Sequence, residues 1–192
     1  MSQRLIIATR NAHKVEEIRT ILSDYDVCDL SILNGPPEVE ETGTTFLQNA
    51  TLKAVAISRE TSALVLSDDS GLEVDALGGE PGVYSSRYAG EDGNDTLNNE
   101  KLLRELSGVT ARAARFRCVM VLAKAGAVLA DFSGSVEGSI LEEKKGGGGF
   151  GYDPLFSPEG YEQSFAELGE ELKNQFSHRS RALEGVAAWL AQ

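Results

Sequence analysis

The sequence is short of long apolar runs and of cysteine. No apolar run approaches the roughly 20 residues that a membrane-spanning helix requires. The run at residues 5–8 is too short for the core of a signal peptide and no cleavage site follows it, so we expect neither a membrane segment nor a leader. The two cysteines, Cys28 and Cys118, lie far apart in apolar stretches. We therefore expect buried free thiols rather than a disulfide, and a cytoplasmic location.

Positive charge is also scarce. There are 18 lysines and arginines against 30 aspartates and glutamates, which gives a formal net charge of −12. Binding to nucleic acid or to an acidic membrane surface depends on clustered basic side chains, so the sequence argues against both kinds of partner. A small polyanionic ligand would need a local cationic pocket, helix N-termini and a divalent cation to hold it.

The distribution of apolar residues predicts an α/β fold. The 192 residues, of which 41% are hydrophobic, suit one domain, and no long linker divides them. Short apolar runs predict strands at residues 4–8, 27–33, 63–67, 116–123 and 128–136. Amphipathic spacing predicts helices after Asn11, after Thr45 with Gln48 in a capping box, over residues 96–106, and after Ser177. Strands that alternate with helices and then form a hairpin indicate a mixed sheet.

The segment from Thr9 to Lys14 joins the first expected strand to the first expected helix. Asn11 would cap this helix and Lys14 would lie in its first turn, where unpaired N–H groups and the helix dipole favour an anion. The Walker and GxGxxG patterns are both absent. The alternative is an ordinary capped helix with a solvated lysine.

Acidic residues cluster at Glu38, Glu40 and Glu41 and again at Asp68 and Asp69. Mg²⁺ prefers oxygen ligands and usually takes one or two carboxylates from the protein. In extended chain, the side chains of Asp68 and Asp69 point to opposite faces, so only one can enter a given site directly. Adjacent acids also raise each other's pKa, which suits a general base. The alternative is a set of surface acids in an acidic protein.

A run of four glycines, residues 146–149, leads into Phe150–Gly151–Tyr152–Asp153–Pro154. Glycine lets the backbone approach a ligand closely. The two aromatic rings could stack on a base, and Asp153 could accept its hydrogen bonds. The alternative is a mobile loop whose aromatic residues pack into the core.

Basic residues follow near the C-terminus at Lys173, His178 and Arg179. A cation in the first turn of a helix opposes the helix dipole, which suggests that it serves a ligand. No serine or cysteine nucleophile motif accompanies His178, so a catalytic triad is not expected. A structural histidine is the alternative.

In their order along the chain, these motifs resemble the inosine/xanthosine triphosphate pyrophosphatase family over nearly the whole length. The matching blocks are Thr9-x-Asn11-x-x-Lys14; Glu41–Thr42–Gly43-x-Thr45–Phe46-x-x-Asn49–Ala50-x-x-Lys53–Ala54; Asp68–Asp69–Ser70–Gly71–Leu72 with Gly78–Gly79-x-Pro81–Gly82-x-Tyr84–Ser85-x-Arg87–Tyr88; Gly149–Phe150–Gly151–Tyr152–Asp153–Pro154; and Ser177–His178–Arg179. Each block is weak alone, whereas the ordered set is specific. Arg10, His13 and Ser86 depart from the residues usual in such blocks, and none has an expected catalytic role.

The resemblance implies a single domain over residues 1–192, with two lobes, an elongated mixed β-sheet flanked by helices, and a nucleotide cleft between the lobes. It implies a homodimer and a Mg²⁺-dependent reaction. The reaction would convert non-canonical purine nucleoside triphosphates (ITP, dITP and XTP) and water to the monophosphate and pyrophosphate. The cellular role would be to remove deaminated purines from the nucleotide pool.

The resemblance also implies the role of each site residue. Asp69 would be the general base and a metal ligand, with Glu40 as the second metal contact and Asp68 or Glu41 close by. The triphosphate would be held by Thr9, Arg10, Asn11, Ala12, His13, Lys14, Lys53 and Ser70. The base and sugar would contact Phe150, Gly151, Tyr152 and Asp153, with Lys173, His178 and Arg179 closing over a 6-oxo purine.

Three alternative functions can be compared with this interpretation. A relative that acts on methylated pyrimidine triphosphates would share most of these motifs. A non-catalytic nucleotide sensor could keep the pocket, but the sequence retains both the acidic pair and the lysines. A redox or acyl-transfer enzyme would need a cofactor fingerprint or a nucleophile motif, and neither is present.

Overall fold

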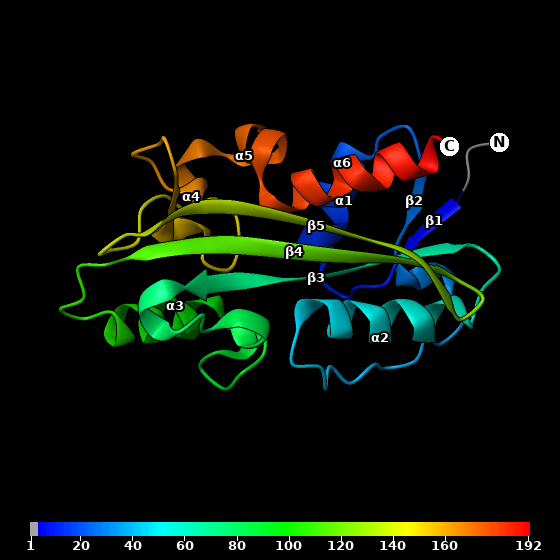
Figure 1. The fold of residues 1–192 in the computed structure, drawn as a ribbon, viewed down its shortest axis with the longest axis horizontal. Helices are drawn as coiled ribbons and strands as arrows, with labels where there is room; N and C mark the ends of the chain where they lie inside the picture. Colours follow the sequence, from blue (N-terminus) through cyan, green and yellow to red (C-terminus); the bar gives the residue numbers. More distant parts are fainter. Residues whose placement is uncertain (1–3) are drawn as a thin grey trace. The chain divides into compact units, whose positions relative to one another are not determined.

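The computed structural model describes residues 4–192, whose six strands form one mixed sheet flanked by helices (Figure 1). The strands are β1 (Arg4–Ile7), β2 (Asp26–Cys28), β3 (Leu64–Val74), β4 (Ala113–Lys124), β5 (Ala127–Ile140) and β6 (Phe156–Pro158). Their order is β2-β1-β3-β4-β5-β6. β1 pairs in parallel with β2 and β3, whereas β5 and β6 are antiparallel. The α/β fold with a mixed sheet is therefore confirmed.

The α-helices are α1 (Ala12–Ile21), α2 (Phe46–Ser58), α3 (Asp95–Glu105), α4 (Phe165–Leu168), α5 (Glu170–Phe176) and α6 (His178–Leu190). The chain divides into two compact units, and the first boundary falls between Asp69 and Ser70, inside β3. Unit 1 contains residues 4–69, 118–134 and 179–192 of the described chain. Unit 2 contains residues 70–117 and 135–178. Each unit thus combines segments that are distant in the sequence.

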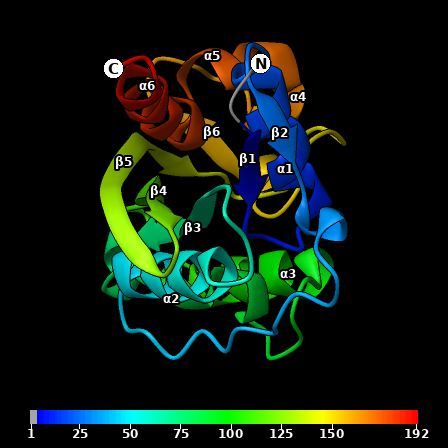
Figure 2. The same ribbon diagram turned by 90° about the vertical axis from the view of Figure 1, so that its right-hand side faces the viewer.

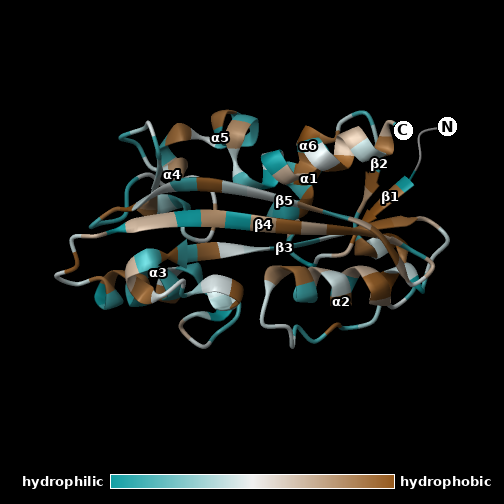
Figure 3. Ribbon diagram, viewed as in Figure 1, coloured by the Kyte–Doolittle hydropathy of each residue, from teal (hydrophilic) through white to brown (hydrophobic). Residues whose placement is uncertain are grey.

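In unit 1, strand residues alternate between two buried faces. Leu5 and Ile7 of β1 pack in one core with Ile18 of α1. Ile6, between them, packs in another core with Ile57 of α2. Figure 2 shows α2 on one face of these strands and α6 on the other, and Figure 3 shows β1 as mostly hydrophobic. Burial on both faces explains why these strands are continuously apolar in sequence.

Unit 2 is built around an aromatic cluster. The rings of Phe116 and Phe156 lie 4.8 Å apart between centroids, and those of Phe156 and Phe165 lie 5.3 Å apart. Leu72 of β3 and Leu102 of α3 belong to the same core. Leu102 of α3 and Phe165 of α4 both belong to this core, so the core holds the two helices in place.

Several local predictions are confirmed. Asn11 caps α1, and its side-chain oxygen accepts the Lys14 N–H. The turn between β4 and β5 is a two-residue hairpin turn, in which Ala125 and Gly126 both have left-handed backbone with φ of 52° and 80°. Such backbone matches the twist of the paired strands. α6 begins at His178, directly after Ser177.

Three local predictions need correction. The strand expected over residues 27–33 ends at Cys28, because the Asp29 side chain accepts the Ser31 N–H at 2.9 Å and starts a short 3₁₀ helix, Leu30–Ile32. The strand expected to end at residue 67 continues to Val74. The capping box of α2 is only half formed, since the Gln48 side chain accepts the N–H of residue 44 instead of that of Thr45.

Both cysteines are free, as expected. Cys118 is buried, but Cys28 is only partly buried. No helix within residues 4–192 has both the length and the apolar character needed to cross a membrane.

Candidate functional site

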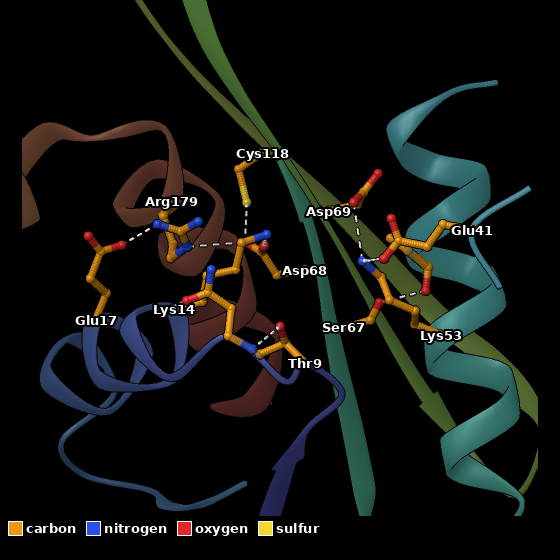
Figure 4. A network of polar contacts seen from close by, with 12 residues as sticks. Thr9, Lys14, Glu17, Glu41, Lys53, Ser67, Asp68, Asp69, Cys118 and Arg179 are labelled. Atoms are coloured by element: carbon orange, nitrogen blue, oxygen red, sulfur yellow. Dashed lines mark hydrogen bonds and ion pairs between the residues drawn. The ribbon is translucent and has the colours of Figure 1, made fainter. Parts of the chain in front are cut away.

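The two aspartates in the middle of β3 project to opposite faces of the strand (Figure 4). Asp68 points towards α1 and α6, and Asp69 points towards α2. Extended backbone imposes this alternation, as the sequence predicts. The two carboxylates therefore have different partners and different electrostatic surroundings.

The Asp68 carboxylate is fully buried and surrounded by donors. Lys14 pairs with its Oδ1, and Arg179 donates its Nε–H to Oδ2 at 3.1 Å. The Cys118 thiol donates to the same oxygen at 3.0 Å. Burial by itself raises the pKa of Asp68, but the nearby Arg179 and Lys14 outweigh burial and hold that pKa well below its ordinary value. Asp68 is thus a stable anion, unsuited to accept a proton.

Asp69 has the opposite character. The Lys53 ammonium lies 3.1 Å from Asp69 Oδ1 and 2.8 Å from Glu41 Oε1. Asp69 Oδ2 is buried and accepts no hydrogen bond from any residue in the described range 4–192. Burial and the nearby Glu41 raise the pKa of Asp69, Lys53 and Lys14 lower it, and the net pKa is raised. A carboxylate with one uncommitted oxygen and a raised pKa is equipped to accept a proton.

Lys53 is the cation that joins these acids. Burial alone lowers its pKa, but Asp69 and Glu41 more than compensate, so the net pKa is raised and the side chain is an ammonium ion. Glu41 is half-buried, whereas Glu40 is exposed. Of the two glutamates, the structure therefore brings Glu41, and not Glu40, to Asp69.

The loop before α1 carries the predicted anion site. The Thr9 hydroxyl oxygen accepts the Asn11 N–H at 3.2 Å, and Asn11 Oδ1 accepts the Lys14 N–H at 3.2 Å. Lys14 itself reaches Asp68. The remaining predicted residues of this segment are exposed: Arg10, Ala12 and His13. Their backbone and side chains are therefore accessible to a ligand.

In unit 2, the Phe150–Asp153 segment forms a tight turn. The Asp153 N–H donates to the Phe150 carbonyl at 3.2 Å, and the Asp153 carboxylate accepts the Phe150 N–H at 3.0 Å. The buried Lys173 of α5 pairs with Asp153 at 2.7 Å, and its ammonium lies 4.6 Å from the centre of the Phe150 ring. The structure thus brings these three predicted residues together.

The two aromatic residues of this turn differ in their surroundings. Phe150 is half-buried, whereas Tyr152 is 3% exposed and its ring packs in the core of unit 2. The Tyr152 hydroxyl donates to the Ser85 carbonyl at 2.8 Å. Ser70, which begins unit 2 on β3, is half-buried. Phe150 is therefore the more exposed of the two aromatic residues of this turn.

His178 and Arg179 are both buried at the start of α6. In unit 2, His178 stacks on Phe116 with ring centroids 4.9 Å apart and planes 13° apart. In unit 1, the Arg179 guanidinium pairs with Asp68 and with Glu17. Their suggested role towards the purine O6 stays a prediction.

No role was predicted from the sequence for two residues that support this site, Glu17 and the motif residue Asn49. Glu17 lies three residues after Lys14 on the same helix face and pairs with Arg179. Asn49 is fully buried, and its Oδ1 accepts the Gly43 N–H at 2.8 Å, which fixes the loop that carries Glu41. The sequence does contain a signal for Glu17, because a charged residue beside the apolar Val15 and Ile18 on a helix is unusual. Such a residue is almost never fully buried unless it is paired.

Comparison with known proteins places this arrangement in a family. Residues 5–189 match the Ham1 family. The chain belongs to the Ham1 family. The resemblance found in the sequence motifs is thereby confirmed.

Individual relatives match over almost their full length. The chain is 50% identical to the dITP/XTP pyrophosphatase of Bacillus licheniformis. The alignment is 194 residues long, gaps included, and covers 99% of each protein. It is 52% identical to the dITP/XTP pyrophosphatase of Desulforamulus reducens, covering 94% of this chain and 92% of that protein. The structure of the Staphylococcus aureus Ham1 protein superposes with a TM-score of 0.89 at 43% identity and 98% coverage of both chains. Both units therefore belong to the shared fold.

Proposed function

We propose that this chain hydrolyses non-canonical purine nucleoside triphosphates, namely ITP, dITP and XTP, to the monophosphate and pyrophosphate. Membership of the Ham1 family and the two dITP/XTP pyrophosphatases that share half of its residues support this substrate class. The observation that supports this reaction is the buried Oδ2 of Asp69, which accepts no hydrogen bond from residues 4–192. The cellular role would be to remove deaminated purines from the nucleotide pool.

Asp69 acts as the general base in this proposal. Its Oδ2 takes a proton from a water molecule while the water oxygen forms a bond to the α-phosphorus. The bond between the α-phosphorus and the bridging oxygen breaks, and pyrophosphate leaves with the electron pair. The raised pKa of Asp69 makes it a stronger base than an exposed aspartate.

The lysines of unit 1 supply the positive charge that the acidic surface lacks. Lys14 and Lys53 are anchored by Asp68 and Asp69, one on each face of β3. Together with Thr9, Asn11 and Ser70, and with the backbone of residues 10, 12 and 13, they would hold the triphosphate. Charge placed in advance where charge develops lowers the barrier without reorganisation during the reaction.

A divalent cation fits the surroundings of Asp69. Asp69 Oδ1 and Glu41 Oε1 already direct negative charge at one cation, the Lys53 ammonium, which leaves Asp69 Oδ2 to act as the base. Within the described range, no three acidic, histidine or cysteine side chains gather closely enough to bind a metal alone. Mg²⁺ commonly takes only one or two protein carboxylates. We propose Asp69 and Glu41 as its ligands, with Glu40 and Asp68 outside direct contact; the ion would screen phosphate charge and make water more acidic.

This assignment predicts a difference between two adjacent glutamates. Glu41→Gln should lower kcat for ITP roughly tenfold and raise the Mg²⁺ concentration needed for half-maximal rate, because it removes a ligand of the ion. Glu40→Gln, at an exposed position, should stay within about twofold of the wild type. The measurement is the rate of pyrophosphate release against Mg²⁺ concentration. A loss in Glu40→Gln, with Glu41→Gln close to the wild type, would reassign the ligand to Glu40.

The Phe150–Asp153 turn would bind the base. Phe150 would stack on the purine, and Gly151, Tyr152, Asp153 and Lys173 would line its edge and the sugar. Donors from His178 and Arg179 to O6 would favour inosine and xanthine over adenine, whose amino group would leave those donors unpaired. Guanine shares O6, so its rejection must depend on the 2-position.

The test of the function is pyrophosphate release from a panel of nucleotides, with Mg²⁺ and with a chelator. ITP and XTP should be cleaved much faster than GTP or ATP, and chelation should abolish the reaction. Faster cleavage of dUTP or methylated UTP would instead favour the relative that acts on modified pyrimidines. If ITP were cleaved no faster than GTP, the substrate assignment would be wrong. Binding of ITP without turnover would indicate a nucleotide sensor.

The proposal also includes a homodimer and a cytoplasmic location. A homodimer is supported by the resemblance, and light scattering after size exclusion measures it directly. A cytoplasmic location is supported by the two free thiols. Fractionation of the cells that make the protein tests the location.

A further inference from the structure

One helix holds both backbone polar groups of Gly151. The Gly151 N–H donates to Asp95 Oδ2 at 2.6 Å, and the Gly151 carbonyl accepts from Asn99 Nδ2 at 2.8 Å. Asp95 and Asn99 are four residues apart on α3, so they project from one face of the helix. α3 thus holds the two peptide groups that flank the Gly151 Cα, entirely within unit 2.

The clamped residue has an unusual backbone conformation. Gly151 has a φ of 62°, in the left-handed region that residues other than glycine rarely occupy. It separates Phe150 from Tyr152 and Asp153, so a rotation of its peptide groups would move the Phe150 ring and the Asp153 carboxylate together. A glycine without such anchors would have wide conformational freedom. The two hydrogen bonds remove that freedom.

Asn99 is buried and oriented so that its amide reaches the Gly151 carbonyl. It is 2% exposed, and its Nδ2 also donates to the Asp95 carbonyl at 2.6 Å. Both acceptors are carbonyl oxygens, so the orientation of the Asn99 amide is determined by its partners. Asparagine is a poor helix former, and its burial in the interior of α3 is explained by the contact with Gly151.

The residues on either side of Gly151 are those that would bind the base, and they contact one another. Asp153 accepts the Phe150 N–H and pairs with Lys173, and Lys173 lies over the Phe150 ring. Gly151 lies inside this turn, between the two side chains that Lys173 contacts. Its anchors therefore determine where the Phe150 ring and the Asp153 carboxylate stand.

We propose that Asp95 and Asn99 are positioning residues for the base-binding turn and act through the backbone N–H and carbonyl of Gly151. This inference rests on the proposed function, since it assigns the turn to purine recognition. Loss of either anchor loosens the turn and weakens binding of the base in the ground state and the transition state alike. Such uniform weakening raises KM and leaves kcat nearly unchanged.

The experiment compares paired variants of α3. Asp95→Ala and Asn99→Ala should each raise KM for ITP about tenfold, with kcat within about twofold, and raise the Kd for IMP in calorimetry by a similar factor. Asp95→Asn keeps an acceptor for the Gly151 N–H and should stay within about threefold of the wild type. The double variant should be less impaired than the product of the two single effects, because both anchors hold the same residue, Gly151.

Asn98→Ala is the matched control for stability. Asn98 is also 2% exposed on α3, but its side chain bonds to the Ala89 N–H and the Ser86 carbonyl, not to Gly151. It should lower the melting temperature about as much as Asn99→Ala while KM for ITP and the Kd for IMP stay near the wild-type values. If Asn99→Ala and Asp95→Ala behaved like this control, the inference would be overturned.

Two further outcomes separate the alternatives. Equal damage from Asp95→Asn and Asp95→Ala would show that the charge at the start of α3 matters and not the hydrogen bond, which overturns the role of Asp95. A wild-type protein that binds IMP but does not cleave ITP would refute the proposed function alone, because the IMP Kd values still decide the inference. A wild-type protein that neither cleaves ITP nor binds IMP would overturn both.

Discussion

Asp69→Asn is expected to lower kcat for ITP by roughly 10²–10⁴-fold, the usual effect of removing a general base. The substitution keeps the shape of the side chain and removes its ability to accept a proton. Asp69 is the carboxylate of the acidic pair with a raised pKa and with an oxygen that takes no hydrogen bond from residues 4–192. The measurement is the steady-state rate of pyrophosphate release at saturating ITP.

This variant should remain folded. An acid whose folded pKa is raised destabilises the folded state at every pH above its unfolded pKa, because the folded environment disfavours the charged form. A neutral asparagine removes that cost, so the melting temperature should equal or exceed that of the wild type. The exposed Asp24→Asn serves as the matched control and should keep full activity. Retained activity in Asp69→Asn would place the base on another group.

Asp68→Ala is expected to lower the free energy of unfolding by about 3–5 kcal/mol, because it breaks a buried ion-pair network on one side. Asp68 is fully buried, and Arg179, 1% exposed, would keep its charge while losing one of its two carboxylate partners. Urea denaturation provides the measurement. Asp24→Ala, at an exposed position, should change stability by less than about 0.5 kcal/mol. A loss for Asp68→Ala as small as that of the control would contradict the structural role.

The same residue gives stability a defined dependence on pH. The folded pKa of Asp68 is lowered, so its contribution is fully present above the unfolded pKa of about 3.9 and is lost as pH falls from there towards the folded pKa. The partly buried Asp29 acts in the same direction, since hydrogen bonds from Ser31 and Arg19 lower its pKa to about 2. The difference between wild type and Asp68→Ala isolates Asp68, and it should shrink as unfolding is measured at successively lower pH below about 4. A difference that does not change with pH would mean that packing, and not charge, carries the effect.

The sequence determined the features that depend on neighbouring residues. The cap at Asn11, the two buried faces of the first strand and the opposite projection of Asp68 and Asp69 all follow from local geometry. The ordered motifs also determined the family, because each motif is a local string of residues. Local reasoning failed at residues 27–33, where the side chain of Asp29 ends the strand within an apolar run.

Only the tertiary structure decided how the two acids differ. Arg179 reaches Asp68 across 111 residues of sequence and pairs with Glu17 across 162, whereas Lys53 lies beside Asp69 and Glu41. A pKa depends on burial and on the charges that packing brings near, and neither can be read from the string Asp-Asp. The ion pair of Glu41, and not Glu40, with Lys53 and the hold of α3 on Gly151 arise in the same way. They are long-range contacts that exist only once the chain has packed.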